Sequence, residues 1–135
     1  MAATAGSQSP QASRQGRSVA VVAPAWLEDA LAVVIKAIPS MRLIACTGSV
    51  QSLILIDLER APDLVVLAVD ASDVKAPDKI RQARFIFPHA RYLVLIQNPG
   101  QNASVRAAGA DETLLQGASA EQFATAVSRL MDPIR

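Results

Sequence analysis

Cysteine, histidine, aromatic residues and net charge are all scarce in this chain of 135 residues. The single cysteine, Cys46, has no partner for an internal disulfide, so we expect a reducing, cytoplasmic location. The chain has one histidine, His89, and together with Cys46 it supplies too few ligands for a zinc site. We therefore predict no bound metal, and nothing else in the sequence indicates a cofactor.

The sequence also lacks the features of a nucleic-acid or membrane surface. Its formal net charge is +1, so no strong field attracts a polyanion. One Trp, one Tyr and three Phe do not suffice for a platform on which bases stack. No strictly apolar run approaches the roughly 18 residues of a membrane span. We expect neither direct nucleic-acid binding nor membrane insertion.

Hydrophobic residues make up 51% of the chain, enough for the core of one domain. The first 17 residues differ, because they hold no acidic residue and no bulky aliphatic residue beyond Met1. Such a segment buries too little apolar surface to offset its ordering entropy. We predict a disordered tail at residues 1–17 and one folded domain at residues 18–135. A transit peptide is a weaker interpretation of the tail.

Apolar segments with two different periods predict an α/β fold. Short runs rich in Val, Ile and Leu predict five strands, at residues 18–23, 41–46, within 61–72, 91–97 and 112–116. Helical periodicity and capping residues predict helices at residues 25–38, 49–60 and 77–87, a short one that ends at 108, and one after Ser119. This alternation implies a doubly wound parallel sheet of order 2-1-3-4-5 with helices on both faces.

Chemistry in open parallel sheets lies at the carboxyl ends of the strands, where this chain offers no reactive set. Ala68 follows the apolar core of the central strand and can do no chemistry. Cys46 ends a strand without an identifiable base, and His89 is predicted to be an exposed loop residue. Because no paired carboxylates or triad follow the strands, we predict that the chain is not an enzyme.

Two of the predicted helices carry surplus apolar or basic side chains. Residues 53–56 are all large aliphatics, so at least one, which we predict to be Leu55, points away from the sheet. It is either a stray surface aliphatic or part of a patch that faces a partner. On the following helix, Lys79, Arg81 and Arg84 are predicted to form a solvated face.

Three motifs resemble the receiver domain of bacterial response regulators. They are Pro-Asp-Leu-Val-Val-Leu at residues 62–67, Ala-Gly-Ala-Asp at 108–111 with Leu-Leu-Gln at 114–116, and Ser-Ala-Glu-Gln-Phe at 119–123. The resemblance spans residues 18–130 and is to CheY-like receivers, in particular those of LuxR/NarL-type regulators. It implies the same doubly wound fold and a role in two-component signalling.

The sequence departs from this family where the family carries its chemistry. The phosphoacceptor aspartate matches Ala68, and the acidic pair that holds Mg²⁺ matches Ala23 and Pro24. The hydroxyl residue of the fourth strand matches Ile96, and the lysine of the fifth matches Gln116. Phosphoryl transfer needs an acceptor oxygen, a cation held by carboxylates and positive charge, and these residues supply none. The resemblance thus implies a degenerate phosphorylation pocket.

The family's switch and output region is altered as well. Thr113 matches the switch aromatic of the fifth strand. The segment from Ile96 to Gln116 is shorter than usual in the family, so we expect a stunted fourth helix.

The leading hypothesis is a pseudo-receiver, a regulatory module that acts without phosphorylation through contacts with a regulatory protein or as a homodimer. The residues predicted for its interaction surface are Leu55, Arg106, Glu112, Gln122 and Arg129. Two alternative hypotheses stay open. In the first, the degenerate phosphorylation pocket binds an apolar or nucleotide-like small molecule. In the second, Asp70, two residues beyond Ala68, accepts a phosphoryl group.

Overall fold

A five-stranded parallel sheet forms the centre of the computed structural model, which describes residues 17–39, 41–55, 61–72 and 74–131. The strands are β1 (Arg17–Val22), β2 (Met41–Thr47), β3 (Leu64–Ala68), β4 (Arg91–Ile96) and β5 (Glu112–Leu115). Their order, β2-β1-β3-β4-β5, confirms the predicted topology. The predicted tail lies outside the described residues, except for Arg17, which begins β1.

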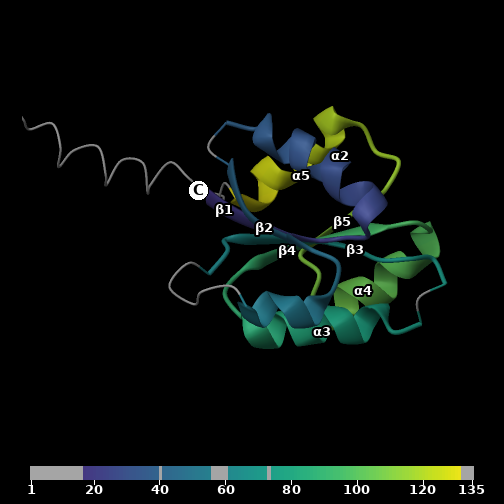
Figure 1. Cartoon of the computed structure of the whole chain (residues 1–135). Helices are drawn as coiled ribbons and strands as arrows, with labels where there is room; N and C mark the ends of the chain where they lie inside the picture. Colours follow the sequence, from purple (N-terminus) through teal and green to yellow (C-terminus); the bar gives the residue numbers. More distant parts are fainter. Residues whose placement is uncertain (1–16, 40, 56–60, 73, 132–135) are drawn as a thin grey trace, which may run out of the picture.

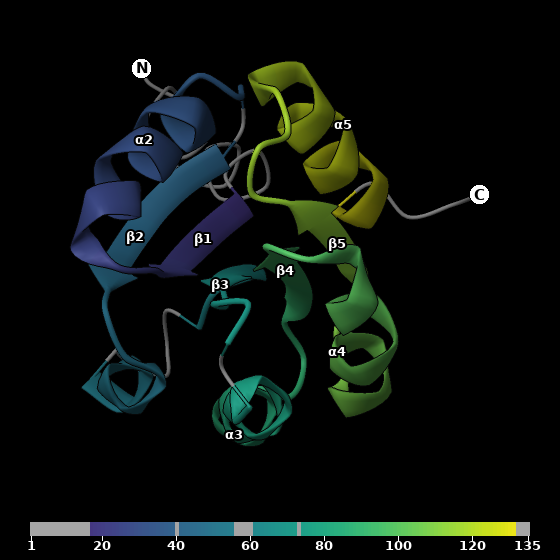
Figure 2. The same cartoon turned by 90° about the vertical axis from the view of Figure 1, so that its right-hand side faces the viewer.

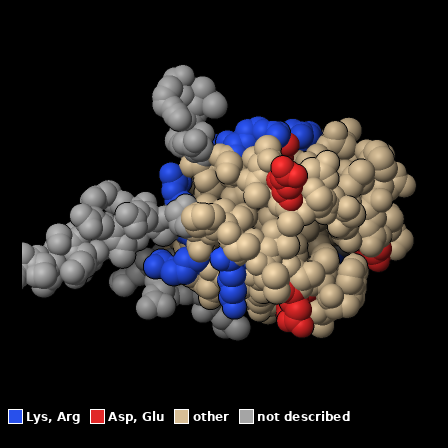
Figure 3. Space-filling view, turned by 90° about the horizontal axis from the view of Figure 1, so that it is seen from above, with Lys and Arg blue, Asp and Glu red and all other residues tan. Residues whose placement is uncertain are grey.

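Helices cover both faces of this sheet (Figures 1 and 2). They are α2 (Ala25–Lys36), the 3₁₀ helix η1 (Val50–Leu55), α3 (Ala76–Ile86), the 3₁₀ turn η3 (Pro99–Gln101), α4 (Asn102–Ala108) and α5 (Ala120–Met131). One face carries α2 and α5, and the other carries η1, α3 and α4. Over α2 and α5 the surface is mostly uncharged, with a few scattered ionic side chains (Figure 3). Within the described ranges, no helix has the length and apolar character needed to cross a membrane.

Alternating side chains of the strands fill two cores, one on each face of the sheet. On β3, Leu64 and Val66 join the core under α2 and α5, whereas Val65 and Leu67 join the core under η1, α3 and α4. All four are at most 1% exposed. Burial on both faces explains why this strand is continuously apolar in the sequence.

Residues 50–55 form a 3₁₀ helix and not the predicted α-helix. Ser49 caps its start as predicted, because its hydroxyl accepts a hydrogen bond from the amide three residues on, at 3.3 Å. A period of three places Val50 and Leu53 on the same side, and both are buried in the core. Ile54 points to solvent, 67% exposed. The side chain of Leu55 and the predicted continuation to residue 60 lie outside the described residues.

Helix α4 ends, and helix α5 begins, where the sequence predicts. Short α4 ends at Ala108 and is followed by the capping residue Gly109, whose φ of 130° favours glycine; a side chain at this position would collide with Arg84. Ser119 and Gln122 form the capping box of α5. The Gln122 amide donates to Ser119 Oγ at 3.1 Å, and the Ser119 amide donates to Gln122 Oε1 at 2.9 Å.

At the amino edge of the sheet, Asp63 fastens β3 to β1. Its carboxylate accepts hydrogen bonds from the amide of Ser18 at 2.9 Å and from the hydroxyl of Ser18 at 3.3 Å. Its own amide donates to the Ser18 hydroxyl oxygen at 3.2 Å. The aspartate of the Pro-Asp-Leu motif therefore has a structural task.

Asp111 makes a similar contact with the amino end of β4. Its carboxylate accepts from the amide of Tyr92 at 2.8 Å and from the guanidinium of Arg84 at 3.3 Å. Arg84 also donates to the carbonyl of Gly109 at 3.0 Å and lies 4.8 Å above the centre of the Tyr92 ring. The prediction that Arg84 belongs to a solvated face is wrong, because its guanidinium joins α3 to the segment that precedes β5.

Candidate functional site

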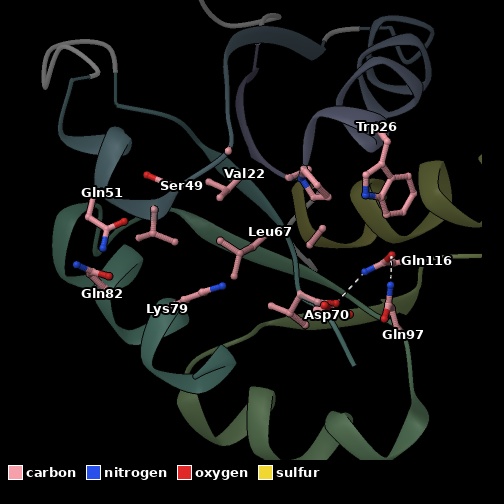
Figure 4. A pocket seen from close by; sticks show the side chains of 16 residues that line it. Val22, Trp26, Ser49, Gln51, Leu67, Asp70, Lys79, Gln82, Gln97 and Gln116 are labelled. Atoms are coloured by element: carbon pink, nitrogen blue, oxygen red, sulfur yellow. Dashed lines mark hydrogen bonds between the residues drawn. The ribbon is translucent and has the colours of Figure 1, made fainter. Parts of the chain in front are cut away.

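A cavity of about 440 Å³ opens at the carboxyl edge of the sheet, where β1 and β3 end (Figure 4). Its apolar part includes Val22, Leu67 and Ala68. The larger side chains that line it are Trp26, Gln51, Lys79, Gln82, Gln97 and Gln116. The cavity lies where parallel sheets generally hold their ligands.

Four of the five residues predicted for the degenerate pocket line this cavity: Ala23, Pro24, Ala68 and Gln116. The fifth, Ile96, is 3% exposed and packs in the core under α3 and α4. Because successive residues of a strand point to opposite faces, Ile96 turns into the core, and its neighbour Gln97 lines the cavity instead.

Gln116 joins the carboxyl ends of β3 and β4. Its Nε2 donates hydrogen bonds to the carbonyl of Val69 at 2.8 Å and to the carbonyl of Leu95 at 3.2 Å. Its Oε1 accepts from Nε2 of Gln97 at 3.4 Å, as the dashed lines of Figure 4 indicate. A neutral amide at the position of the family's lysine therefore binds carbonyl groups of the backbone.

Two more glutamine contacts extend this network to the loop after β3. Gln97 Oε1 accepts from the amide of Ala71 at 2.8 Å, and Gln101 Nε2 donates to the carbonyl of Asp70 at 2.8 Å. Gln101 Oε1 in turn accepts from the amide of Gln97 at 3.0 Å. The side chains of Gln97, Gln101 and Gln116, which we call the glutamine network, thus join the segments after β3, β4 and β5 without an ionic group.

The side chains of the cavity do not fit the Mg²⁺ ion that a receiver domain implies. Mg²⁺ takes oxygen ligands in octahedral geometry, and neither Ala23 nor Pro24 offers a side-chain oxygen. Among the described residues, Asp70 is the one acidic side chain that lines the cavity. The same residues contain no group of three or more His, Cys, Asp or Glu that could hold a metal ion. Asp70 therefore lacks the acidic pair that a phosphoacceptor of this family uses.

Besides Gln97, four large side chains that line the cavity were not predicted from the sequence. Trp26, 69% exposed at the start of α2, lies two residues after Pro24, the second residue that matches the acidic pair, so its position in the sequence was a usable signal. Gln51 comes from η1, and Lys79 and Gln82 come from α3. Gln51 and Gln82 line the part of the cavity that η1 and α3 form (Figure 4). No local sequence pattern relates Gln51 to Lys79 and Gln82, because only the packing of η1 on α3 brings them to the same cavity.

The residues predicted for an interaction surface fall in two places. Glu112 of β5 pairs with Arg129 of α5 at 2.9 Å, and Gln122 caps the same helix. Arg106 is exposed on α4, which packs beside β5. Leu55 belongs to η1, at the other end of the sheet and next to α3 (Figure 2), so the structure does not group it with the other four.

Neither Cys46 nor His89 belongs to this cavity. His89 is exposed in the loop before β4, as predicted. Cys46 lies on the edge strand β2, where partial burial raises the pKa of its thiol, with a smaller contribution from the negative charge of Glu28. A thiol with a raised pKa is a weak nucleophile at neutral pH, because the reactive form is the thiolate.

No protein-family model matches the sequence, and no curated protein matches it. Solved structures do match. A LuxR-family DNA-binding response regulator from Staphylococcus aureus has a TM-score of 0.70 and 15% identity, over 84% of this chain and 98% of that chain. The signal receiver domain of the response regulator NarL from Mycobacterium tuberculosis has a TM-score of 0.72 and 14% identity, over 87% and 98%. A structure described as a pilus assembly protein (cpaE), from Burkholderia thailandensis, has a TM-score of 0.73 and 15% identity, over 87% and 99%.

These identities are low, so the likeness concerns the fold. It agrees with the strand order and with the helices on both faces of the sheet. The described chain has the CheY-like fold of response-regulator receiver domains.

Proposed function

We propose that this chain is a regulatory module of the receiver type that acts through protein contacts, without phosphorylation. One observation carries the proposal: the carboxyl edge of the sheet is joined by the glutamine network, where receivers have ionic residues. Phosphoryl transfer needs an acceptor oxygen, a cation held by carboxylates and a positive charge, and the residues at the matching positions of this edge are Ala23, Pro24, Ala68 and Gln116.

The same network supports a module with one conformation. In a switch, a ligand must bind two states with different affinity, and a phosphoryl group needs donors that respond to it. Here the amides already have partners, at 2.8 Å for both Gln116 with Val69 and Gln101 with Asp70. The loops are therefore held in place without a phosphoryl group.

Under this proposal the partner is a regulatory protein or a second copy of the chain, in the cytoplasm. The predicted contact residues remain Leu55, Arg106, Glu112, Gln122 and Arg129. The names of the matched structures include a DNA-binding regulator and a pilus assembly protein, so the fold alone does not select the partner.

The test is to expose the protein to beryllofluoride with Mg²⁺ and to record backbone amide shifts by NMR. We expect no change around Ala68 and Asp70. Acetyl phosphate, followed by intact mass measurement, should likewise give no phosphoryl adduct. An adduct that disappears in Asp70→Asn would support atypical phosphoacceptance at Asp70 and would overturn the proposal.

A second candidate function is binding of a small molecule in the cavity. It is favoured by the combination of an apolar floor, several amide side chains and the exposed indole of Trp26, which suits a planar molecule with a polar edge. Adenosine and benzamide are suitable probes, and Trp26, the one Trp of the chain, reports binding by its fluorescence. A ligand at 100 times its Kd would add about 2.7 kcal/mol to the free energy of unfolding. Ala68→Phe should abolish this gain in stability, because the larger side chain fills the apolar part of the cavity.

A further inference from the structure

The outward side of α2 carries a continuous apolar stripe. Trp26 and Val33 are each 69% exposed, and Ala30 and the C-cap residue Ala37 are exposed between and beyond them. These four residues follow each other at intervals of four, three and four, the spacing of the contact positions of a coiled coil. The opposite side of α2 is occupied, because Leu31 and Ile35 are buried against the sheet. The stripe, residues 26, 30, 33 and 37, therefore has no partner among the described residues.

We propose that this stripe is a homodimer contact, in which α2 packs antiparallel against α2 of a second copy around a two-fold axis. In that arrangement Trp26 faces Ala37 of the second copy, and Val33 faces Ala30. Each large side chain thus meets a small one, and the two-fold axis repeats both pairs. A parallel arrangement would place Trp26 against Trp26 and Ala30 against Ala30, which leaves clashes and gaps along the helix.

The charges beside the stripe favour the same orientation. Asp29 and Lys36 flank it on one side and are both exposed. Seven residues separate them, about 10.5 Å along the helix axis, so they do not form a neighbouring pair within α2. In the antiparallel dimer Asp29 of each copy lies beside Lys36 of the other. In a parallel dimer the two-fold axis would instead place this charged flank beside the other flank of the second copy, which is apolar.

The other flank of the stripe is apolar. Leu27 and Val34 are half-buried there and line a groove of about 110 Å³ between α2 and β5, which also includes the partly exposed Leu115. Stable interfaces bury about 1,200–2,000 Å² in total. A helix of 12 residues is about 18 Å long and provides less than that by itself. We therefore expect a dimer that dissociates on dilution.

This inference rests on the proposed function in naming one contact through which the module acts. The test is sedimentation equilibrium of the full chain over a concentration series, with a mass that rises from 14.2 kDa towards twice that value. Trp26 emission should shift to shorter wavelength over the same range, because the indole becomes buried. Val33→Glu should raise the Kd by about tenfold or more, since a carboxylate would be buried against an apolar face. Phe85→Glu, which also replaces an exposed apolar side chain but on α3, is the matched control and should leave the Kd unchanged.

Exchanging the two charges tests the orientation. Asp29→Lys and Lys36→Asp should each weaken the dimer, and the double variant should restore it, because opposite charges meet again. Thermal unfolding of each variant is the structural control. In the double variant the exchanged charges are unfavourable for the helix dipole of α2, so a restored dimer cannot result from a more stable helix. A protein that stays monomeric at every concentration, or a dimer weakened equally by Val33→Glu and Phe85→Glu, would overturn the inference. The beryllofluoride result does not affect it, so the two proposals fail separately.

Discussion

The two edges of the sheet differ in the kind of side chain that holds the strands together. At the amino edge, Asp63 and Asp111 accept hydrogen bonds from the amides of Ser18 and Tyr92. At the carboxyl edge, Gln116 donates to backbone carbonyls. Parallel strands leave amides free at one edge and carbonyls at the other, so acceptors suit the first edge and donors suit the second. The carboxyl edge thus needs a donor but no charge.

This difference explains why the resemblance to receivers is uneven along the chain. The recognisable motifs, Pro-Asp-Leu and Ala-Gly-Ala-Asp, contain the two aspartates of the amino edge, which hold the sheet together. The positions that match the family's reactive residues are at the carboxyl edge, where Ala68 and Gln116 now stand. Under the proposed function, fold and reactivity depend on different edges of one sheet, so one can change while the other is kept.

The largest effect on stability should come from Asp111→Ala. This change leaves the Tyr92 amide and the Arg84 guanidinium without their acceptor, and hydrogen bonds to charged groups contribute about 1.5–3 kcal/mol. We expect a loss of about 2–3 kcal/mol in urea unfolding. Asp78→Ala is the control, because its ion pair with Arg81 is exposed and should cost at most about 0.5 kcal/mol. A smaller loss for Asp111→Ala than for Gln116→Ala would reverse the comparison of the edges.

Tyr92→Phe should have the next largest effect, about 1–2 kcal/mol. The Tyr92 hydroxyl lies 2.8 Å from the carbonyl of Ala83 and 2.7 Å from that of Phe87. Burial raises the pKa of Tyr92, so the unfolded chain ionises first, near pH 10, and stability falls as the pH rises further. Urea unfolding between pH 8 and 11 should show this fall in the unmodified protein and a smaller one in Tyr92→Phe. Equal slopes would contradict it.

Gln116→Ala should cost about 1 kcal/mol, since the hydrogen bonds that it removes are neutral and partly accessible to water. Gln116→Lys is the matched variant. It keeps a donor at this position and should lose less than half as much in the same unfolding experiment. If the lysine variant were as unstable as the alanine variant, the carboxyl edge would require the amide itself and not simply a donor.

The smallest effect is expected for Ala68→Asp, which should leave the protein unable to accept a phosphoryl group. The acceptor oxygen would be restored, but Ala23 and Pro24 still could not hold Mg²⁺. Intact mass after treatment with acetyl phosphate should show no adduct. The combined variant with Ala23→Asp and Pro24→Asp should bind Mg²⁺, measurable by calorimetry. An adduct on Ala68→Asp alone would show that the rest of the edge retains more of the family's chemistry than its residues indicate.

The site was predictable where single positions carried the information. Ala23, Pro24, Ala68 and Gln116 lie at or just beyond the carboxyl ends of strands, so the motif alignment located them at one edge, and all four line the cavity. Ile96 ends β4 at the same edge, but the alternation of side chains along the strand turns it into the core. The partners of Gln116 could not be read from the sequence, because its contact with Val69 joins residues 47 positions apart.

The sequence by itself determined the succession of strands and helices along the chain, the capping box at Ser119 and the glycine that follows α4. Each of these depends on periodicity or on dihedral preferences within a few residues, which are local properties of the chain. Only the tertiary structure decided that Arg84 leaves the solvated face of α3 to reach Asp111, and that the outward stripe of α2 is left without a partner. Such outcomes depend on which distant surfaces meet, and local sequence patterns do not encode that.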